Sequence, residues 1–270
     1  MQGFNFNRLA PKAASVLQRP PLCKYSSESI TNEALMYNGV ALQSGTSHYF
    51  GQKFSKAYDI SFVNKENKQE YAYQTSWGVT TRLIGAIIMT HGDDNGLVLP
   101  PAVAPIQAVV IPVASHKEGV KENCAKLYDR LKDKFRVKFD DSDNSPGWKF
   151  AEYEMKGVPL RLEIGPRDIE NNQCVIVRRD NREKIFVNLD ELAIRIPELL
   201  AEYNTALYNK ALERREAMTY DAKNLDEIKE IADTKPGFIR AMWCGDRECE
   251  EKLKEVAGIS SRCIPFEQHE

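Results

Sequence analysis

The sequence predicts a mixed α/β protein built from successive blocks, and three observations support this. Short β-like runs alternate with stretches of helical hydrophobic period along most of the chain. A Pro-rich entry, PPAVAP, precedes a buried-strand run at 107–113 and indicates a boundary near residue 103. Residues 189–216 predict one long charged helix that connects the last block to the rest.

Composition excludes several classes of protein. The chain has 270 residues, of which 42% are hydrophobic and 28% charged, with a formal net charge of −2. Such a chain is long enough to bury a core and is not disordered. The near-neutral charge excludes a generally basic nucleic-acid coat, although a local basic patch stays open. No apolar run approaches the ~20 residues of a membrane span. Six scattered cysteines without a secretory signal predict reduced thiols and a cytoplasmic protein.

The first 27 residues contain four basic side chains and no acid. An acid-poor, basic start is typical of an organelle transit peptide. It is equally typical of a flexible, Pro-broken terminus, which we favour. We therefore leave residues 1–27 unassigned.

The block 28–104 contains the β-like runs YDISFV and EYAYQTSW, an apolar helix at 79–91 and the turn cluster HGDDNG. In the block 105–203, a helix at 118–133 has apolar residues at helical spacing: Val120, Cys124, Leu127 and Leu131. The strand FRVKFDD follows, then a helix opened by SPGW, then the strands VPLRLEIG and QCVIVRRD, the latter paired with KIFVNL. This order favours an α/β unit with a mixed sheet.

The block 204–270 contains the end of the connector helix and a small α/β module. Its expected elements are a helix LDEIKEIADT, a strand GFIRAMWC, a helix CEEKLKEVAG and a strand SRCIPF.

Thr80, Thr81 and Arg82 follow the glycine of SWG at the start of the helix at 79–91, within a stretch that otherwise looks buried. A helix N-terminus presents free N–H groups that favour phosphate or carboxylate, and arginine adds bidentate anion recognition. The alternative is an arginine that extends from the helix start into solvent.

The stretch ALQSGTSHYFGQKF contains Gln43, Ser44, Thr46, Ser47 and His48 near two glycines. Small residues and hydroxyls let a ligand approach the backbone, and histidine offers a switchable donor. An ordinary polar turn is the alternative.

Together these stretches resemble one family. LQSGTSHYFGQKFSKAYDI, YQTSWGVTTRLIGAIIMTHGDDNGLVLPP, SPGWKF with KGVPLRLEIGPRD, and MWCGDREC with SRCIPF follow one another in the order found in prolyl-tRNA synthetases of the archaeal and eukaryotic type. The likeness covers about residues 28–267. It implies part of a class II antiparallel-sheet catalytic domain at 28–104, an anticodon-binding domain at 105–203, and a connector with a truncated zinc-type domain at 204–270.

The resemblance implies ATP-dependent activation of proline to prolyl-adenylate and transfer of prolyl to tRNA(Pro), with Mg accompanying the ATP. In it, GVTTR is class II motif 3, whose arginine packs against ATP. The implied ATP contacts are Gln43, Thr46, Thr80 and Arg82. The implied proline pocket consists of His48, Ser76 and Gly78. Arg82 and His48 are the expected catalytic residues, and Trp77 is expected in the sheet core.

The anticodon-binding domain implies tRNA(Pro) as a partner. Splayed bases are read by stacking and by polar contacts on their edges. The candidate residues for this are Lys149, Glu163, Arg167 and Asp168. A glutamate that accepts from guanine, beside a basic residue, suits the guanines of a proline anticodon. Arg178 and Arg179 lie on a nearby expected strand.

CGDREC places Cys244 and Cys249 five residues apart across a turn, which allows half of a zinc site. The family's second cysteine pair has no counterpart in this sequence. Cys263 is expected to be a buried core thiol, and His269 is a ligand only by accident. A four-ligand site is therefore not predicted.

The family's motifs 1 and 2, which should precede residue 28, have no match in the sequence. We therefore expect a C-terminal portion of a synthetase that is inactive alone, and the family's homodimer interface to be mostly missing. A tRNA-binding module that has lost catalysis is the alternative function. Retention of the motif 3 set favours the ligase, while GTSH and CGDREC disfavour a histidyl or threonyl homologue.

Overall fold

The computed structural model describes residues 15–19 and 28–265, which form two compact units. The first unit holds residues 91–211, and the second combines residues 15–19 and 28–90 with residues 212–265. Both units contain helices and strands, so the predicted α/β class is confirmed. None of the described helices is long and apolar enough to cross a membrane.

A five-stranded sheet forms the centre of the first unit, in the order β11-β10-β9-β7-β8. Its strands are β7 Ala108–Pro112, β8 Val137–Phe139, β9 Leu160–Ile164, β10 Gln173–Arg178 and β11 Lys184–Asn188. β7 runs parallel to β8 and β9, because helical crossovers connect these strands, whereas β10 pairs antiparallel with β9 and β11. The predicted mixed sheet and the pairing of QCVIVRRD with KIFVNL are confirmed.

The helices of this unit are α3 Val120–Leu131, α4 Pro146–Met155, α5 Pro166–Glu170 and the long α6 Leu192–Ala217, whose end belongs to the second unit. α4 begins at the predicted place. The Ser145 hydroxyl accepts a hydrogen bond from the Trp148 backbone N–H, and Pro146 fits the first turn, whose N–H groups have no helical partner.

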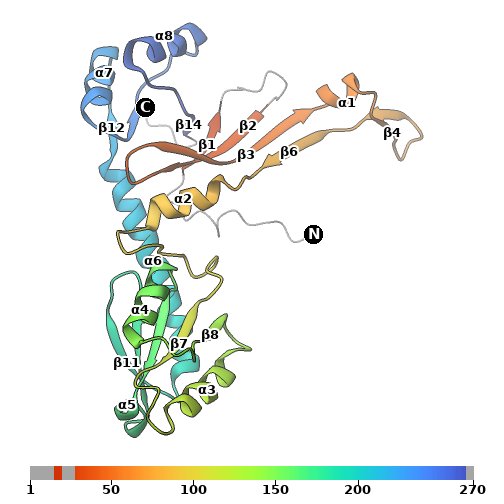
Figure 1. Ribbon diagram of the computed structural model, residues 1–270. Helices are drawn as coiled ribbons and strands as arrows, with labels where there is room; N and C mark the ends of the chain where they lie inside the picture. Colours follow the sequence, from red (N-terminus) through yellow and green to blue (C-terminus); the bar gives the residue numbers. More distant parts are fainter. Residues whose placement is uncertain (1–14, 20–27, 266–270) are drawn as a thin grey trace. The chain divides into compact units, whose positions relative to one another are not determined.

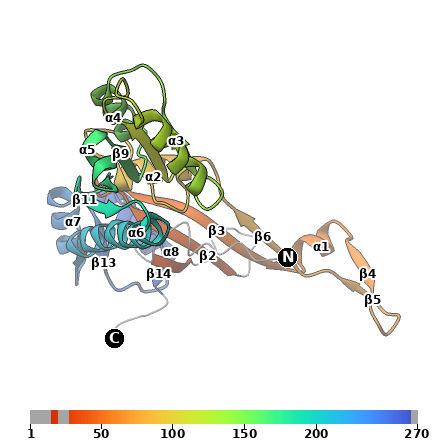
Figure 2. The ribbon, with the colours of Figure 1, turned by 90° about the horizontal axis from the view of Figure 1, so that it is seen from below.

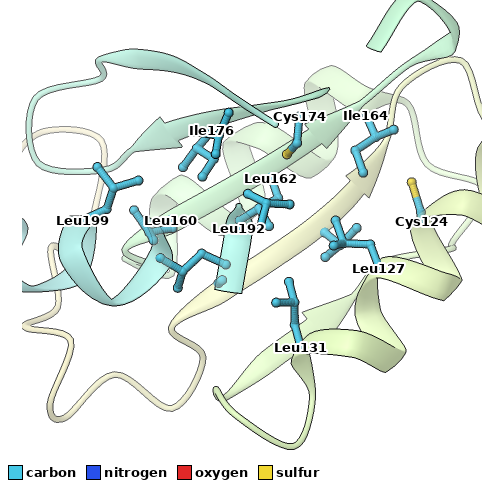
Figure 3. Close-up of a cluster of buried hydrophobic side chains, with 14 of the residues drawn as sticks. Cys124, Leu127, Leu131, Leu160, Leu162, Ile164, Cys174, Ile176, Leu192 and Leu199 are labelled. Carbon is cyan, nitrogen blue, oxygen red and sulfur yellow. The ribbon is translucent and has the colours of Figure 1, made fainter. Parts of the chain in front are cut away.

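The two faces of this sheet are covered differently. Leucines of α3 and α6 pack with those of β9 in the larger core, which Figure 3 shows. Cys124 and Cys174 lie in this core, and burial raises the pKa of both thiols, that of Cys124 to about 12. They therefore act as small hydrophobic residues. On the opposite face, Tyr153 of α4 packs with Val109 and Ile111 of β7.

The second unit contains an antiparallel sheet in the order β14-β1-β2-β3-β6. Its strands are β1 Ser15–Arg19, β2 Glu28–Leu35, β3 Ala41–Gly51, β6 Gln74–Gly78 and β14 Ile264–Pro265. The stretch with the GTSH motif is thus a long central strand rather than a turn. β3 and β6 run side by side towards α1 Lys53–Ala57 and the hairpin of β4 Ser61–Val63 and β5 Gln69–Tyr71 (Figures 1 and 2).

The rest of the second unit comprises α2 Arg82–His91 and the small C-terminal module. The module contains β12 Thr219–Asp221, α7 Leu225–Thr234, β13 Phe238–Arg240 and α8 Arg247–Ala257. Both predicted helices of the module are confirmed, with Asn224 and Asp246 as their N-caps. Cys263 is half-buried, so its assignment as a buried core thiol was wrong.

Candidate functional site

Two neighbouring strands, β3 and β6, bring together candidate residues that lie far apart in the sequence. Thr46 lies directly opposite Gly78, and His48 lies directly opposite Ser76. Directly opposed residues of an antiparallel pair project from the same face of the sheet. Four of the candidate residues therefore share one sheet face.

A β-bulge adds Gln43 to the same face. In a regular strand Gln43 and Thr46, three residues apart, would project from opposite faces. On β2, however, Glu33 pairs with Gln43 while the preceding residue pairs with Gly45, so that Ser44 has no direct partner. One extra residue in the strand reverses the alternation and aligns Gln43 with Thr46.

Buried polar side chains of β2 support this face from the neighbouring strand. Ser29 Oγ and His48 Nδ1 are 2.7 Å apart. Gln43 Nε2 donates to Thr31 Oγ1 at 3.2 Å, and Thr31 Oγ1 donates to Glu33 Oε1 at 3.1 Å. These bonds restrict the rotamers of His48 and Gln43, and so they pre-organise two candidate ligand contacts.

The sequence analysis did not identify this polar row. Ser29, Thr31 and Glu33 are 2%, 1% and 0% exposed, although none is hydrophobic. Their spacing of two residues in ESITNE was the available signal, since it places all three on one face of a strand. Arg262 approaches the same carboxylate, with its Nη1 3.9 Å from Glu33 Oε2.

Arg82 is the first residue of α2, so the helix begins three residues later than predicted. The Arg82 backbone N–H donates to Thr80 Oγ1 at 3.3 Å, and the Leu83 N–H donates to the Thr80 carbonyl at 3.2 Å. Thr80 thus accepts hydrogen bonds from N–H groups of the first helical turn, although Thr80 itself lies outside the helix. The Arg82 side chain is exposed, and no carboxylate in the described part of the chain pairs with it.

The junction between β6 and α2 is exposed, which contradicts the buried junction expected from its apolar sequence. Trp77 is 72% exposed and is not part of a sheet core, and Ile84 on α2 is 63% exposed. A Cβ atom on Gly78 would meet nothing within 4 Å. The sheet surface above Gly78 is therefore open to a ligand.

Among the anticodon candidates, Lys149 is buried inside the first unit and hydrogen-bonded there. It is 1% exposed, and its Nζ donates to the carbonyls of Asp140 at 2.9 Å and Ser142 at 2.7 Å. The Asp140 carboxylate lies 3.5 Å from the same Nζ. Lys149 therefore holds the 140–142 turn, and its contribution to RNA binding would be indirect.

The other three candidates cluster around the end of β9 and the start of α5. Asp168 Oδ2 accepts from the Gly165 backbone N–H at 2.8 Å, which fixes the first turn of α5. Glu163 is 9% exposed and accepts from Arg161 Nε at 2.8 Å. Arg167 is exposed. Arg167 is thus the exposed candidate of the three, whereas Glu163 is buried and Asp168 is half-buried.

Two arginines at the end of β10, Arg178 and the following Arg179, are paired within the protein. Arg178 makes two hydrogen bonds to Asp180, at 2.8 and 3.0 Å. Arg179 makes two to Asp93, at 2.6 and 2.8 Å, and a third to the Glu154 carbonyl at 2.8 Å. Both side chains therefore stabilise the domain.

Cys244 and Cys249 lie close enough for their thiols to interact, and the hydrogen bond from Cys249 lowers the pKa of Cys244. Cys249 lies in α8, which follows a turn at Gly245 with a positive φ of 87°. No group of three or more potential metal ligands occurs among the residues that the structure describes. His269 lies outside those residues. Among the described residues, Cys244 and Cys249 thus provide two of the ligands that a four-ligand zinc site would need.

Comparisons with known proteins agree with this arrangement. The family described as Anticodon binding domain matches residues 107–199, and the family described as Prolyl-tRNA synthetase, C-terminal, matches residues 225–270. The proline–tRNA ligase of Clostridium novyi (strain NT) is 65% identical over 240 residues, which are 89% of this chain and 50% of that relative. That of Ruminiclostridium cellulolyticum is 60% identical over the same shares.

A solved structure extends the likeness to the fold. The prolyl-tRNA synthetase of Cryptosporidium parvum, complexed with L-proline and AMP, superposes with a TM-score of 0.87 at 38% identity, covering 97% of this chain and 58% of that one. The chain spans about half the length of the curated relatives it matches. From the sheet geometry and these likenesses together, the chain belongs to the prolyl-tRNA synthetase family.

Proposed function

We propose that the chain is part of a proline–tRNA ligase. It would contribute one side of the site that activates proline with ATP, and the domain that reads the anticodon of tRNA(Pro). The shared sheet face carries this proposal: Thr46 and His48 lie opposite Gly78 and Ser76, and a bulge aligns Gln43 with them. Five candidate residues from two segments thus share one sheet face, which supports the proposal.

In this reaction a proline carboxylate oxygen attacks the α-phosphorus of ATP. The bond from that phosphorus to the bridging oxygen breaks, and pyrophosphate leaves. A ribose hydroxyl at the tRNA 3′ end then attacks the adenylate carbonyl and releases AMP. Both steps depend on positioning and charge neutralisation more than on a strong general base.

The side chains divide this task by position. Arg82 and Thr80, at the start of α2, would face the ATP, since the exposed Arg82 guanidinium favours an anion. Gln43 and Thr46 would hold the nucleotide from the sheet. His48 and Ser76 would bind proline, with Gly78 leaving room for the adenylate. Mg would accompany the ATP as part of the substrate.

The anticodon would be read by the first unit. Glu163 can accept from a guanine edge, and exposed Arg167 can contact phosphate. Lys149 and Asp168 would act indirectly, by holding the turns on which these groups sit. The homodimer and the cytoplasmic location implied by the resemblance stay predictions for the whole protein.

Proline-dependent exchange of pyrophosphate into ATP tests the ligase proposal. The assay compares the chain alone with the chain plus a fragment that carries motifs 1 and 2 of the family. We expect no exchange by either part and exchange by the mixture. The exposed residues Trp77 and Ile84 provide an apolar surface for such a second part.

Two results would contradict parts of the proposal. Exchange by the chain alone would mean that its site needs no further residues. If the mixture shows no exchange but still binds tRNA(Pro), the ligase function is refuted and a tRNA-binding module without catalysis is favoured.

A further inference from the structure

One large apolar side chain on the first unit has no evident structural role. Phe186 lies in β11, at the edge of the mixed sheet, and is 66% exposed. No aromatic or cation–π contact of its ring occurs within the described part of the chain. An exposed phenylalanine on an edge strand favours association and is normally avoided unless it binds something.

The register of the sheet shows which groups share a face with Phe186. Val175 of β10 lies directly opposite Phe186 on one side and Glu163 on the other. The three residues therefore form a row across β11, β10 and β9. Neighbouring strands lie ~4.8 Å apart, so the Cα atoms of Phe186 and Glu163 are roughly 10 Å apart.

A second, basic row lies beside the first. Val177 lies directly opposite both Arg161 and Lys184. Arg161 donates through Nε to Glu163 at 2.8 Å, and its guanidinium lies 4.2 Å from the centre of the Phe150 ring. Its Nη groups and the exposed Lys184 make no hydrogen bond within the described part of the chain. Both remain available to an anion.

The outer edge of this face is exposed at Phe186 and Lys184, whereas Val177 and Glu163, nearer the centre of the sheet, are buried. The larger core uses the other face, from which Cys174, Ile176 and Val187 project. On the face of Phe186, α4 packs against β7. A cavity of about 210 Å³ adjoins the basic row, lined by Arg161, Val177 and Lys184 among others. The edge of the sheet thus combines a flat aromatic ring with two cationic groups.

We infer that Phe186 is a stacking platform for one unpaired base of a tRNA loop, an assignment that rests on the proposed function. A base on the ring would extend over Val175, while Lys184 would contact the adjoining phosphate. The neighbouring cationic groups match the charge of RNA. An apolar protein partner would not use them.

The test measures binding of the full chain to the anticodon stem–loop of tRNA(Pro) at several salt concentrations. Loop bases are replaced one at a time by 2-aminopurine, whose fluorescence falls when it stacks. Phe186→Ala should lower the affinity by roughly 5- to 100-fold, the range for one stacked base. Phe186→Tyr should stay within about threefold of the unaltered chain, because the ring is kept.

The matched control is Phe62→Ala, which removes another exposed phenylalanine, 49% exposed, from the second unit. It should leave the affinity unchanged. Lys184→Ala should reduce the salt dependence by about one phosphate contact, while Phe186→Ala should leave the salt dependence unaltered. Both variants should keep the far-ultraviolet circular dichroism of the unaltered chain, since both side chains are exposed.

The outcomes separate this inference from the proposed function. Equal affinities of Phe186→Ala and the unaltered chain, with no quenched loop position, would overturn the stacking assignment alone. If the unaltered chain binds a scrambled anticodon loop equally well, and Phe186→Ala weakens both, stacking stands and the proline-specific function fails. Binding of neither RNA would overturn both and leave the ring as a surface for a protein partner.

Discussion

The ion pair between Asp93 and Arg179 fixes the turn HGDDNG to the mixed sheet of the first unit. Arg179 donates twice to the carboxylate, at 2.6 and 2.8 Å, and its side chain is 3% exposed. Asp93→Asn removes the negative charge but keeps one oxygen for the Asn95 backbone N–H, which now donates to Asp93 at 2.9 Å. The substitution therefore removes the charge together with one of the two acceptors for Arg179.

Two estimates bound the effect of Asp93→Asn on the free energy of unfolding. The hydrogen bonds from Arg179 lower the pKa of Asp93 from 3.8 to about 2, which corresponds to roughly 2.4 kcal/mol before screening. The Asp93 side chain is 40% exposed, so water screens part of this interaction. Removing one partner of a fully buried pair costs about 3–5 kcal/mol. Because only Arg179 is buried, we expect Asp93→Asn to cost about 1–2 kcal/mol.

The assay is urea unfolding of the full chain followed by tryptophan fluorescence. Trp148 lies in the first unit, whereas Trp77 and Trp243 lie in the second. In a chain with Trp77→Phe and Trp243→Phe, the fluorescence reports the first unit separately. This is needed because two units need not unfold in one transition. Asp94→Asn, an exposed neighbour without an ion pair in the described part of the chain, serves as the control.

The pH dependence has a definite sign. A folded-state pKa below the unfolded value of about 3.9 means that the pair stabilises the fold above pH 4 and is lost as the pH falls towards 2. The difference between the unaltered chain and Asp93→Asn should therefore shrink to about half at pH 3. A cost below about 0.5 kcal/mol at pH 7, or one equal to that of Asp94→Asn, would refute the reasoning.

Three further predictions separate catalytic, positioning and structural side chains. Arg82→Ala should lower proline-dependent exchange of the complemented enzyme by about 100-fold or more, since a donor to developing phosphate charge contributes roughly 3 kcal/mol. Ser29→Ala should lower kcat/KM for proline about five- to tenfold by freeing His48, and Ser29→Thr should restore it, as measured by the same exchange. Lys149→Met should lower the unfolding free energy of the first unit by about 3 kcal/mol in urea, whereas Arg167→Ala should leave it unchanged and weaken tRNA binding.

Local signals explain which elements the sequence could predict. α4 was predictable because Ser145 and Pro146 specify a helix start without reference to the rest of the chain. The pairing of β10 with β11 was predictable because two β-rich runs flank a short turn. α2 began later than expected, because the Thr80 hydroxyl accepts the hydrogen bond of the Arg82 N–H. The periodicity of hydrophobic residues does not reveal such a side-chain bond to the backbone.

The candidate site depended on contacts that no local signal reports. The sequence motifs identified Gln43 and Thr46 as candidates. The two side chains share one face of the sheet because of a bulge at Ser44, and this bulge depends on how β3 pairs with β2. Lys149 looks like a surface residue of a helix. Its burial follows from two carbonyls of the 140–142 turn, whose conformation depends on the Asp140 carboxylate binding the Ser142 N–H.

The two units differ in how completely they bury their apolar surface, and this difference bears on what the chain can do alone. The first unit has a continuous core on one face of its sheet and a smaller one on the other. In the described part of the second unit, the buried hydrophobic residues are Leu35, Met36, Ala86 and Ala222.

The sheet of the second unit also ends, among the described strands, at β6, which carries the exposed Trp77. A bare strand edge beside exposed apolar side chains is a surface that proteins normally cover. Under the proposed function, RNA binding would need only the first unit and should be retained by this chain. Activation of proline would also need the strand edge of the second unit to be covered, because among the described strands only β3 pairs with β6, which carries Ser76 and Gly78. Binding and catalysis should consequently separate in the complementation assay, with tRNA affinity present before the second part is added and exchange appearing only afterwards.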